Sequence, residues 1–221
     1  MLILYIVPNK LVEHIKKVWL PFNRAFILNL ILSNQTWQVM SRNYKFHDQE
    51  KPYFISFATV YWIDVFIRPI YKGILVDSIN HCIKEKGLIV YAWVIMTSHV
   101  HMIIGTRKEK MQDILRDLKK YTSKALINAI KENPVESRKE WMLWMMKRAG
   151  RKNGNNTTYQ FWQQHNKPIE LTDNQIAEQK LDYLHNNPVA EGFVYEPHEY
   201  KYSSAIDYGG NKGLVDVELM M

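Results

Sequence analysis

The chain has 221 residues, of which 47% are hydrophobic and 23% are charged, values that are ordinary for a globular protein. This length fits one domain with appendages better than two full domains. The single cysteine, Cys82, excludes a disulfide framework and a multi-cysteine zinc site, and it favours a reducing cytoplasm. The formal net charge of +7 suggests a polyanionic partner without proving one. The apolar stretches near the start are shorter than the roughly 20 residues that cross a bilayer, so we expect no membrane contact.

The first part of the chain differs from the remainder. Residues 1–39 hold apolar clusters without clear alternation or capping, and they are interpreted as an N-terminal extension of a domain over residues 40–221. The first strand is predicted at residues 53–60, a run rich in aromatic and β-branched side chains. Residues 69–86 have the apolar spacing of a helix, and Gly87 is the expected stop signal at its C-terminus.

A hairpin and a long helix follow. The runs Leu88–Met96 and His99–Thr106 are predicted strands, and Thr97 and Ser98 between them favour a tight turn. Residues 110–132 have the periodicity of a long amphipathic helix. Tyr121 falls on the predicted apolar stripe of this helix, so we expect it in the core.

Capping boxes predict the start of two further helices, because a Ser or Thr and a Glu or Gln three residues later can satisfy the first backbone N–H groups. Ser137 and Glu140 form one such pair, and the helix after them is expected to end near Gly150. Thr172 and Gln175 form the second pair.

A loop, a predicted extended stretch and a late helix follow in the sequence. Residues 150–158 form a polar, Gly/Asn-rich loop, and residues 159–164 are a predicted extended stretch. The late helix is expected to run to about Asn187, where Pro188 would stop it. The order over residues 53–164 is then β-α-β-β-α-β. This order predicts an α+β protein with a ferredoxin-like split βαβ antiparallel sheet.

Two histidines on one predicted strand are the first candidates for chemistry. His99 and His101 are two residues apart, so both side chains leave the same face of the strand. Two imidazoles on one face can share a divalent metal ion. The spacing alone is weak evidence, because most such pairs are structural. The residues between and after them are apolar and would face the core: Val100, Met102 and Ile104.

A tyrosine and an amide on the late helix are the second candidates. Tyr183 and Asn187 are four residues apart and hence adjacent on one helix face. They could place a nucleophile beside a third metal ligand. The structural alternative is a packing tyrosine and a C-terminal asparagine before proline. His185 points away from Tyr183 on a helix, so it is a poor candidate ligand.

Several aromatic residues could contact unpaired bases, but a structural role is at least as consistent with the sequence. The segment from Trp141 to Met146 is apolar on almost all sides, which is more typical of core or partner contact than of a stacking platform. Phe161 and Trp162 follow the basic loop and could stack on bases, or they could belong to the core.

Two motifs in this order resemble a known family. Residues 92–104, AWVIMTSHVHMII, resemble the HUH segment of single-tyrosine transposases. Residues 181–194, LDYLHNNPVAEGFV, resemble the nucleophile helix of REP-associated tyrosine transposases, and 161–165 (FWQQH) and 200–208 (YKYSSAIDY) are similar to that branch. The resemblance covers residue 40 to about residue 215, and the joint occurrence of the two main motifs is what makes it specific.

The resemblance implies a chemistry for the candidate residues. His99 and His101 would bind Mg²⁺ or Mn²⁺, and Asn187 would complete the metal shell. Tyr183 would attack the scissile phosphate and form a 5′-phosphotyrosine. The implied substrate is single-stranded DNA folded into imperfect hairpins, such as repetitive extragenic palindromes. Further DNA contacts are expected from a set of basic residues: Lys119, Lys120, Lys147, Arg148, Arg151 and Lys152.

Alternatives remain at this point. A module that binds DNA hairpins without cutting them is one, and a metal-dependent phosphodiester hydrolase without a covalent intermediate is another. The resemblance implies a cytoplasmic, nucleoid-associated protein and is compatible with a monomer or a homodimer. Residues 1–39 have no counterpart, and Met40 looks like the ordinary family start. We therefore expect an over-called start codon, with a genuine extension as the alternative.

Overall fold

The computed structural model describes residues 46–152, 154, 158–164 and 166–220. The proposed extension at residues 1–39, its boundary at Met40 and part of the polar loop at 150–158 lie outside the described residues.

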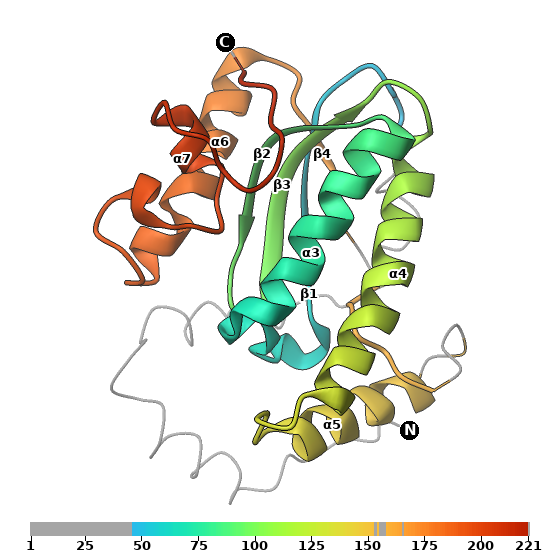
Figure 1. Ribbon diagram of the computed structural model, residues 1–221. Coiled ribbons are helices and arrows are strands. Elements are labelled where there is room, and N and C mark those ends of the chain that lie inside the picture. The colour runs from blue at the N-terminus through green and yellow to red at the C-terminus, as the bar shows by residue number, and fades with distance from the viewer. Residues whose placement is uncertain (1–45, 153, 155–157, 165, 221) are drawn as a thin grey trace, which may run out of the picture. The chain divides into compact units, whose positions relative to one another are not determined.

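Four strands form one antiparallel sheet in the order β2-β3-β1-β4 (Figure 1). This strand order, with helices after the first and third strands, is the ferredoxin-like split βαβ arrangement, so the predicted α+β fold class is confirmed. β3 lies in the interior of the sheet between β2 and β1, and its position decides where the histidine pair is held. The strands are β1 (Tyr53–Ala58), β2 (Leu88–Ile95), β3 (His99–Thr106) and β4 (Ile169–Glu170).

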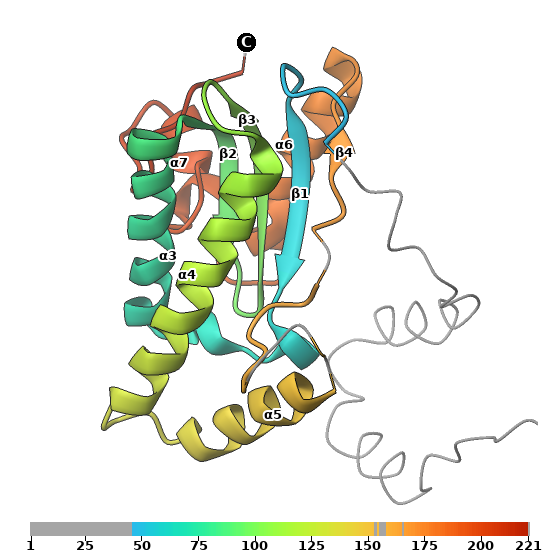
Figure 2. The same ribbon diagram turned by 90° about the vertical axis from the view of Figure 1, so that its right-hand side faces the viewer.

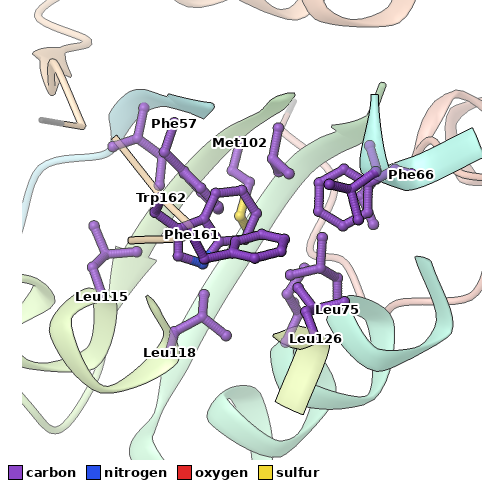
Figure 3. Packing of buried hydrophobic residues seen from close by; sticks show 14 of the residues in the cluster. Phe57, Phe66, Leu75, Met102, Leu115, Leu118, Leu126, Phe161 and Trp162 are labelled. Carbon is purple, nitrogen blue, oxygen red and sulfur yellow. The ribbon is translucent and has the colours of Figure 1, made fainter. Parts of the chain in front are cut away.

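Two helices, α3 (Pro69–His81) and α4 (Met111–Glu132), cover one face of the sheet (Figures 1 and 2). Alternate residues of β3 from Val100 to Ile104 point to this face and are buried in the larger core, together with the side chains in Figure 3. Burial of apolar area at about 25 cal/mol per Å² stabilises this layer and fixes the register of β3. The β3 residues in this core are Val100, Met102 and Ile104, as predicted.

The opposite face of the sheet is covered by α6 (Asn174–Ala190) and the short α7 (Ala205–Tyr208) (Figure 1). A second, smaller core lies here and contains Phe54 of β1, Ile103 of β3 and Leu184 of α6. Because side chains alternate along a strand, His99 and His101 belong to this face with Ile103. The fold therefore brings the histidine pair and the late helix to the same side of the sheet.

The hairpin and the first helix agree with the sequence. Met96 donates its backbone N–H to the carbonyl of His99 at 2.9 Å, which closes the predicted tight turn. α3 continues into a π-helical turn, η3 (Cys82–Lys86), and Gly87 then caps it with φ of 73°. A Cβ at Gly87 would lie 2.7 Å from Cγ of Lys108, so both the conformation and the space favour glycine.

The fourth strand is not where the sequence predicted it. Residues 159–164 make an isolated bridge, between Thr59 and Trp162, and the strand itself is the two-residue β4. Phe161 and Trp162 are buried among the helices, and Nε1 of Trp162 donates a hydrogen bond to Oγ1 of Thr122 at 3.0 Å. The two rings therefore have the core role that was one of the two interpretations, and they are not free to stack on bases.

The predicted helix starts were wrong in detail. α5 (Lys139–Arg151) begins without a capping side chain at Arg138, so the box at Ser137 and Glu140 does not form. α6 is capped by Asp173, whose carboxylate accepts the N–H of Ile176 at 2.9 Å, in place of the predicted Thr172. Asp is as good an N-cap as Thr, and the choice between neighbours depends on the chain path.

The late helix also passes through Pro188 and ends at Ala190. Proline removes one N–H donor, but the turn after it is closed by Glu191 N–H on the carbonyl of Asn187 at 3.1 Å and by Phe193 N–H on the carbonyl of Pro188 at 2.9 Å. Asn187 is thus inside the helix, with the same face relationship to Tyr183 that the spacing required.

Tyr121 was wrongly expected in the core, since 65% of it is exposed. The buried stripe of α4 advances in steps of four from Leu118 through Thr122 and Leu126 to Ile130, and Tyr121 lies beside it. No helix within the described part of the chain is long and apolar enough to span a bilayer.

Candidate active site

His101 is the most buried member of the candidate site. It lies on β3 opposite Ser56 of β1 and Val94 of β2, and only 6% of it is exposed. Its ring stacks on Phe54, with centroids 5.4 Å apart and an interplanar angle of 23°. Among the described residues, neither of its ring nitrogens has a hydrogen-bond partner. A buried polar group without a partner costs about 1–3 kcal/mol, and these nitrogens are available to a ligand.

His99 lies next to His101 on the same face of β3. The two rings are 4.8 Å apart, and Nδ1 of His99 is 3.3 Å from Oγ of Ser98. Asp64, in the segment between β1 and α3, acts on His99 electrostatically and accepts a hydrogen bond from Oγ1 of Thr97 at 2.7 Å. This hydrogen bond ties the turn between β2 and β3 to the segment that follows β1.

Burial keeps both imidazoles neutral at ordinary pH. Loss of solvation lowers the pKa of His99 to about 4, although the carboxylate of Asp64 acts in the opposite direction. Loss of solvation lowers the pKa of His101 to about 3, and the charges of His99 and Lys180 contribute in the same direction. A neutral imidazole has a free lone pair, and this is the form that binds a metal ion. The pair therefore fits a divalent ion.

Tyr183 brings a hydroxyl-bearing ring to the histidines from α6. Its ring centroid is 5.3 Å from that of His101 and 6.0 Å from that of Phe54. Half of the residue is exposed, and its hydroxyl makes no hydrogen bond with any described residue. The ring is thus held from one side by the protein while the other side is open to a substrate.

Asn187 lies one helical turn after Tyr183 and is partly buried. Its side chain makes no hydrogen bond with the described residues, so its amide oxygen is available as a ligand. No group of three or more His, Cys, Asp and Glu side chains that could hold a metal is found in the described part of the chain. Among the described residues, a third protein ligand for an ion on the histidine pair would therefore be of another type, such as an amide.

Three neighbours of the site were not identified from the sequence. Phe54 forms its floor through contacts with His101 and Tyr183. Lys180 lies one turn before Tyr183, and its Nζ is 5.4 Å from the Phe54 ring. Trp62 contacts His99 edge to face at 5.5 Å. Only Lys180 had a usable signal, because its spacing to Tyr183 places both on one helix face.

The expected DNA-contacting residues fall into two groups. The ammonium of Lys119 is used inside the protein, where it donates to the carbonyl of Gln163 at 2.9 Å and to Oδ1 of Asn166 at 2.7 Å. Burial lowers its pKa to about 8. The other members are exposed, on α4, on α5 and at the C-cap of α5, and Arg148 stacks on the half-exposed Trp144 at 5.4 Å. These residues are Lys120, Lys147, Arg148, Arg151 and Lys152.

The position of α5 places the exposed basic group near one end of the sheet. α5 packs against η1 (Val60–Trp62), the turn that contacts His99 (Figure 2). Met142 and Met146 are its buried side, whereas Trp141 and Trp144 are exposed. The apolar segment from Trp141 to Met146 thus has one side in the core, as one interpretation of the sequence had it, and exposes two indole rings on the other side.

Comparison with known proteins gives a structural match. No protein-family model and no curated protein matches the sequence. A REP-associated tyrosine transposase, solved bound to a REP hairpin, matches with a TM-score of 0.55 at 15% identity, over 81% of this chain and 92% of the other. A presumed transposase from Deinococcus radiodurans, at 19% identity, matches over 45% of this chain and 90% of the other with a TM-score of only 0.33. The resemblance seen in the sequence is therefore confirmed at the level of the fold: the described domain has the fold of a REP-associated tyrosine transposase.

Proposed function

We propose that this protein is a metal-dependent single-tyrosine DNA strand transferase that nicks and rejoins single-stranded, hairpin-containing DNA. The observation that carries the proposal is the cluster of His99, His101 and Tyr183. Two elements far apart in sequence place two neutral imidazoles and a half-exposed tyrosine within ring contact. The shared fold with a transposase solved on a REP hairpin supports hairpin DNA as the substrate class.

The metal would be held by His99 and His101, with Asn187 as the third protein ligand. The proposed ion is Mg²⁺ or Mn²⁺. Neutral protein ligands would leave it with most of its charge and with positions for phosphate oxygens, which both ions bind well. Such an ion would withdraw charge from the phosphodiester and stabilise the transition state. The partnerless nitrogens of His101 are the observation in this chain that supports the assignment.

The residues of the chain carry out the steps of bond cleavage and strand joining. The Tyr183 oxygen attacks the scissile phosphorus, forming a tyrosine–phosphate bond and breaking the bond to the 3′ oxygen. The phenolic proton passes to solvent, and the leaving 3′ oxygen takes up a proton to become a hydroxyl. Attack by a 3′-hydroxyl on the phosphotyrosine reverses these steps and joins the strands, so no nucleotide cofactor is consumed. Lys180, on the same helix face, is placed to neutralise phosphate charge beside the nucleophile.

Incubation with end-labelled hairpin single strands and Mn²⁺, followed by a denaturing gel, tests this proposal. We expect a labelled protein band with the wild-type chain and none with Tyr183→Phe. Tyr195→Phe is the matched control, because Tyr195 is 92% exposed and has no part in the site. Cleavage without a protein band would favour a phosphodiester hydrolase. Binding without cleavage, under conditions where metal is bound, would favour a hairpin-binding module.

A further inference from the structure

The turn after β1 has an unusual backbone. Tyr61 and Trp62 both have φ of 55°, in the left-handed region that residues with a Cβ adopt rarely. Two such residues in succession are disfavoured and persist only where the surrounding structure dictates them. The turn therefore has a conformation that its own side chains do not prefer.

Hydrogen bonds of a buried threonine hold this turn in place. Oγ1 of Thr59 donates to the carbonyl of Ile63 at 2.8 Å and is 3.1 Å from the carbonyl of Ser98, which immediately precedes His99. The N–H of Trp62 bonds to the carbonyl of Thr59 at 3.1 Å. Thr59 is fully buried, so the turn is coupled rigidly to the start of β3.

The strained backbone presents two aromatic rings to solvent. Tyr61 is 43% exposed and Trp62 is 54% exposed, whereas their neighbours Val60 and Ile63 are buried in the core. Packing in the core therefore explains the residues on either side of the turn, but it does not explain why the two aromatic rings are exposed. One edge contact fixes the indole: the ring centroids of Trp62 and His99 are 5.5 Å apart at an angle of 71°.

We propose that Trp62 is a stacking platform that binds one unpaired base of the DNA strand beside the scissile phosphate. This inference rests on the proposed function, because His99 is then part of the phosphate-binding site and Trp62 is in contact with it. Every base has a π-face, so an exposed indole binds single strands with little sequence preference. A paired base in a duplex is already stacked and cannot use the indole.

The chemistry of the indole ring favours a base over a phosphate at this position. The ring offers a flat apolar face to a base and has no positive charge with which to bind a phosphate. The strand would thus place a base on Trp62 and its phosphate toward His99, His101 and Tyr183. Trp62 would act as a positioning residue for the nucleotide next to the cut.

The test uses a DNA hairpin with single-stranded deoxyadenosine tails and the same hairpin with abasic tails. Both carry the same charge, so their affinity ratio reports base contacts alone. Fluorescence anisotropy in EDTA measures binding without cleavage. For the wild-type chain we expect the base-bearing tails to bind about 5- to 100-fold more tightly. Trp62→Ala should bring this ratio close to one, and Trp62→Phe should retain most of it.

Two further variants keep the result interpretable. Trp62→Gly also removes the ring, and glycine accepts the left-handed backbone, so this variant should melt no lower than the wild-type chain. Tyr121→Ala is the control, because Tyr121 is also an exposed ring and lies on α4, the helix on the far side of the sheet from α6. Its ratio should be unchanged.

A wild-type ratio in both Trp62→Ala and Trp62→Gly would overturn the role of Trp62. If the wild-type chain still forms the covalent band with Mn²⁺, the proposed function survives that result. If the wild-type chain binds neither hairpin and forms no covalent band with Mn²⁺, both proposals are overturned.

Discussion

The ring of Tyr183 on α6 lies 5.3 Å from the ring of His101 on β3, a contact made across the second, smaller core of the domain. Leu184 follows Tyr183 and Ile103 comes two residues after His101 in the sequence. Both are buried in that core and hold the helix against the strand. The chemistry of the site thus depends on ordinary apolar packing between two elements.

The partnerless imidazole of His101 should destabilise the metal-free protein. Replacing it by leucine, in His101→Leu, removes two unsatisfied nitrogens and keeps contact with Phe54. We expect the melting temperature in EDTA to rise by roughly 2–4 °C for each kcal/mol recovered, while Mn²⁺ binding is lost. Calorimetry with and without Mn²⁺ measures both effects. A lower melting temperature in EDTA would mean that the nitrogens have partners in the folded protein.

Removal of either histidine should abolish metal-dependent cleavage more completely than removal of the amide. His99→Ala and His101→Ala are each expected to lower cleavage about 100-fold or more, because a shell missing an imidazole holds Mg²⁺ poorly. Asn187→Ala should be milder, since water can replace one amide oxygen. Cleavage rates over a Mn²⁺ titration measure this order, with His81→Ala on α3 as the control. Full activity in excess EDTA would contradict the metal assignment for all three residues.

His185 should make the folded state sensitive to acid. Its Nε2 is 2.9 Å from Oγ of Ser204, and burial lowers its pKa to about 4. Because the folded pKa lies below the unfolded value of about 6.5, the unfolded chain binds more protons as the pH falls. The contribution of neutral His185 to the free energy of unfolding is fully present above about pH 6.5. It is lost as the pH falls toward 4, a change of the order of 3 kcal/mol.

Urea unfolding in EDTA at a series of pH values measures this dependence. His185→Gln should flatten the decline of stability between about pH 6.5 and pH 4. Parallel curves for the two proteins would show that His185 does not titrate as a buried neutral group.

The basic residues should separate into a structural and a DNA-binding class. Lys119→Met removes the buried ammonium that binds Gln163 and Asn166, so it should lower the melting temperature. Arg148→Ala should leave melting unchanged and reduce the slope of log affinity against log salt by about one, the value for a single lost phosphate contact. Binding at several salt concentrations measures the slope. An unchanged slope for Arg148→Ala would remove α5 from the proposed DNA interface.

The sequence predicted the sheet and the histidine pair because both depend on local periodicity. Alternation along β3 places His99 and His101 on one face of the strand. The apolar residues between and after them face the main core, so the histidine face points to solvent or to a second layer. The face relationship of Tyr183 and Asn187 follows from helical spacing in the same way. The motifs therefore predicted which side chains share a surface.

The remainder depended on tertiary packing. β4 pairs only two residues with Tyr53 and Phe54, which is too short to have a pattern of its own. Trp62 reaches His99 because Tyr61 and Trp62 have a left-handed backbone. The sequence has no glycine at either position that would have indicated such a turn. Lys119 and Arg148 are both basic residues on predicted helices, so the sequence does not separate them. In the structure Gln163 and Asn166 bind the ammonium of Lys119, whereas Arg148 is exposed.

Mass-spectrometric mapping of the covalent product tests the central claim most directly. The protein is incubated with hairpin single strands and Mn²⁺, digested with a protease and a nuclease, and the nucleotide-bearing peptide is sequenced. We expect the nucleotide to be attached through a 5′-phosphate to Tyr183, the exposed ring beside His101. A nucleotide on another residue, such as Tyr121, or cleaved DNA without any modified peptide, would contradict the assignment of Tyr183 as the nucleophile.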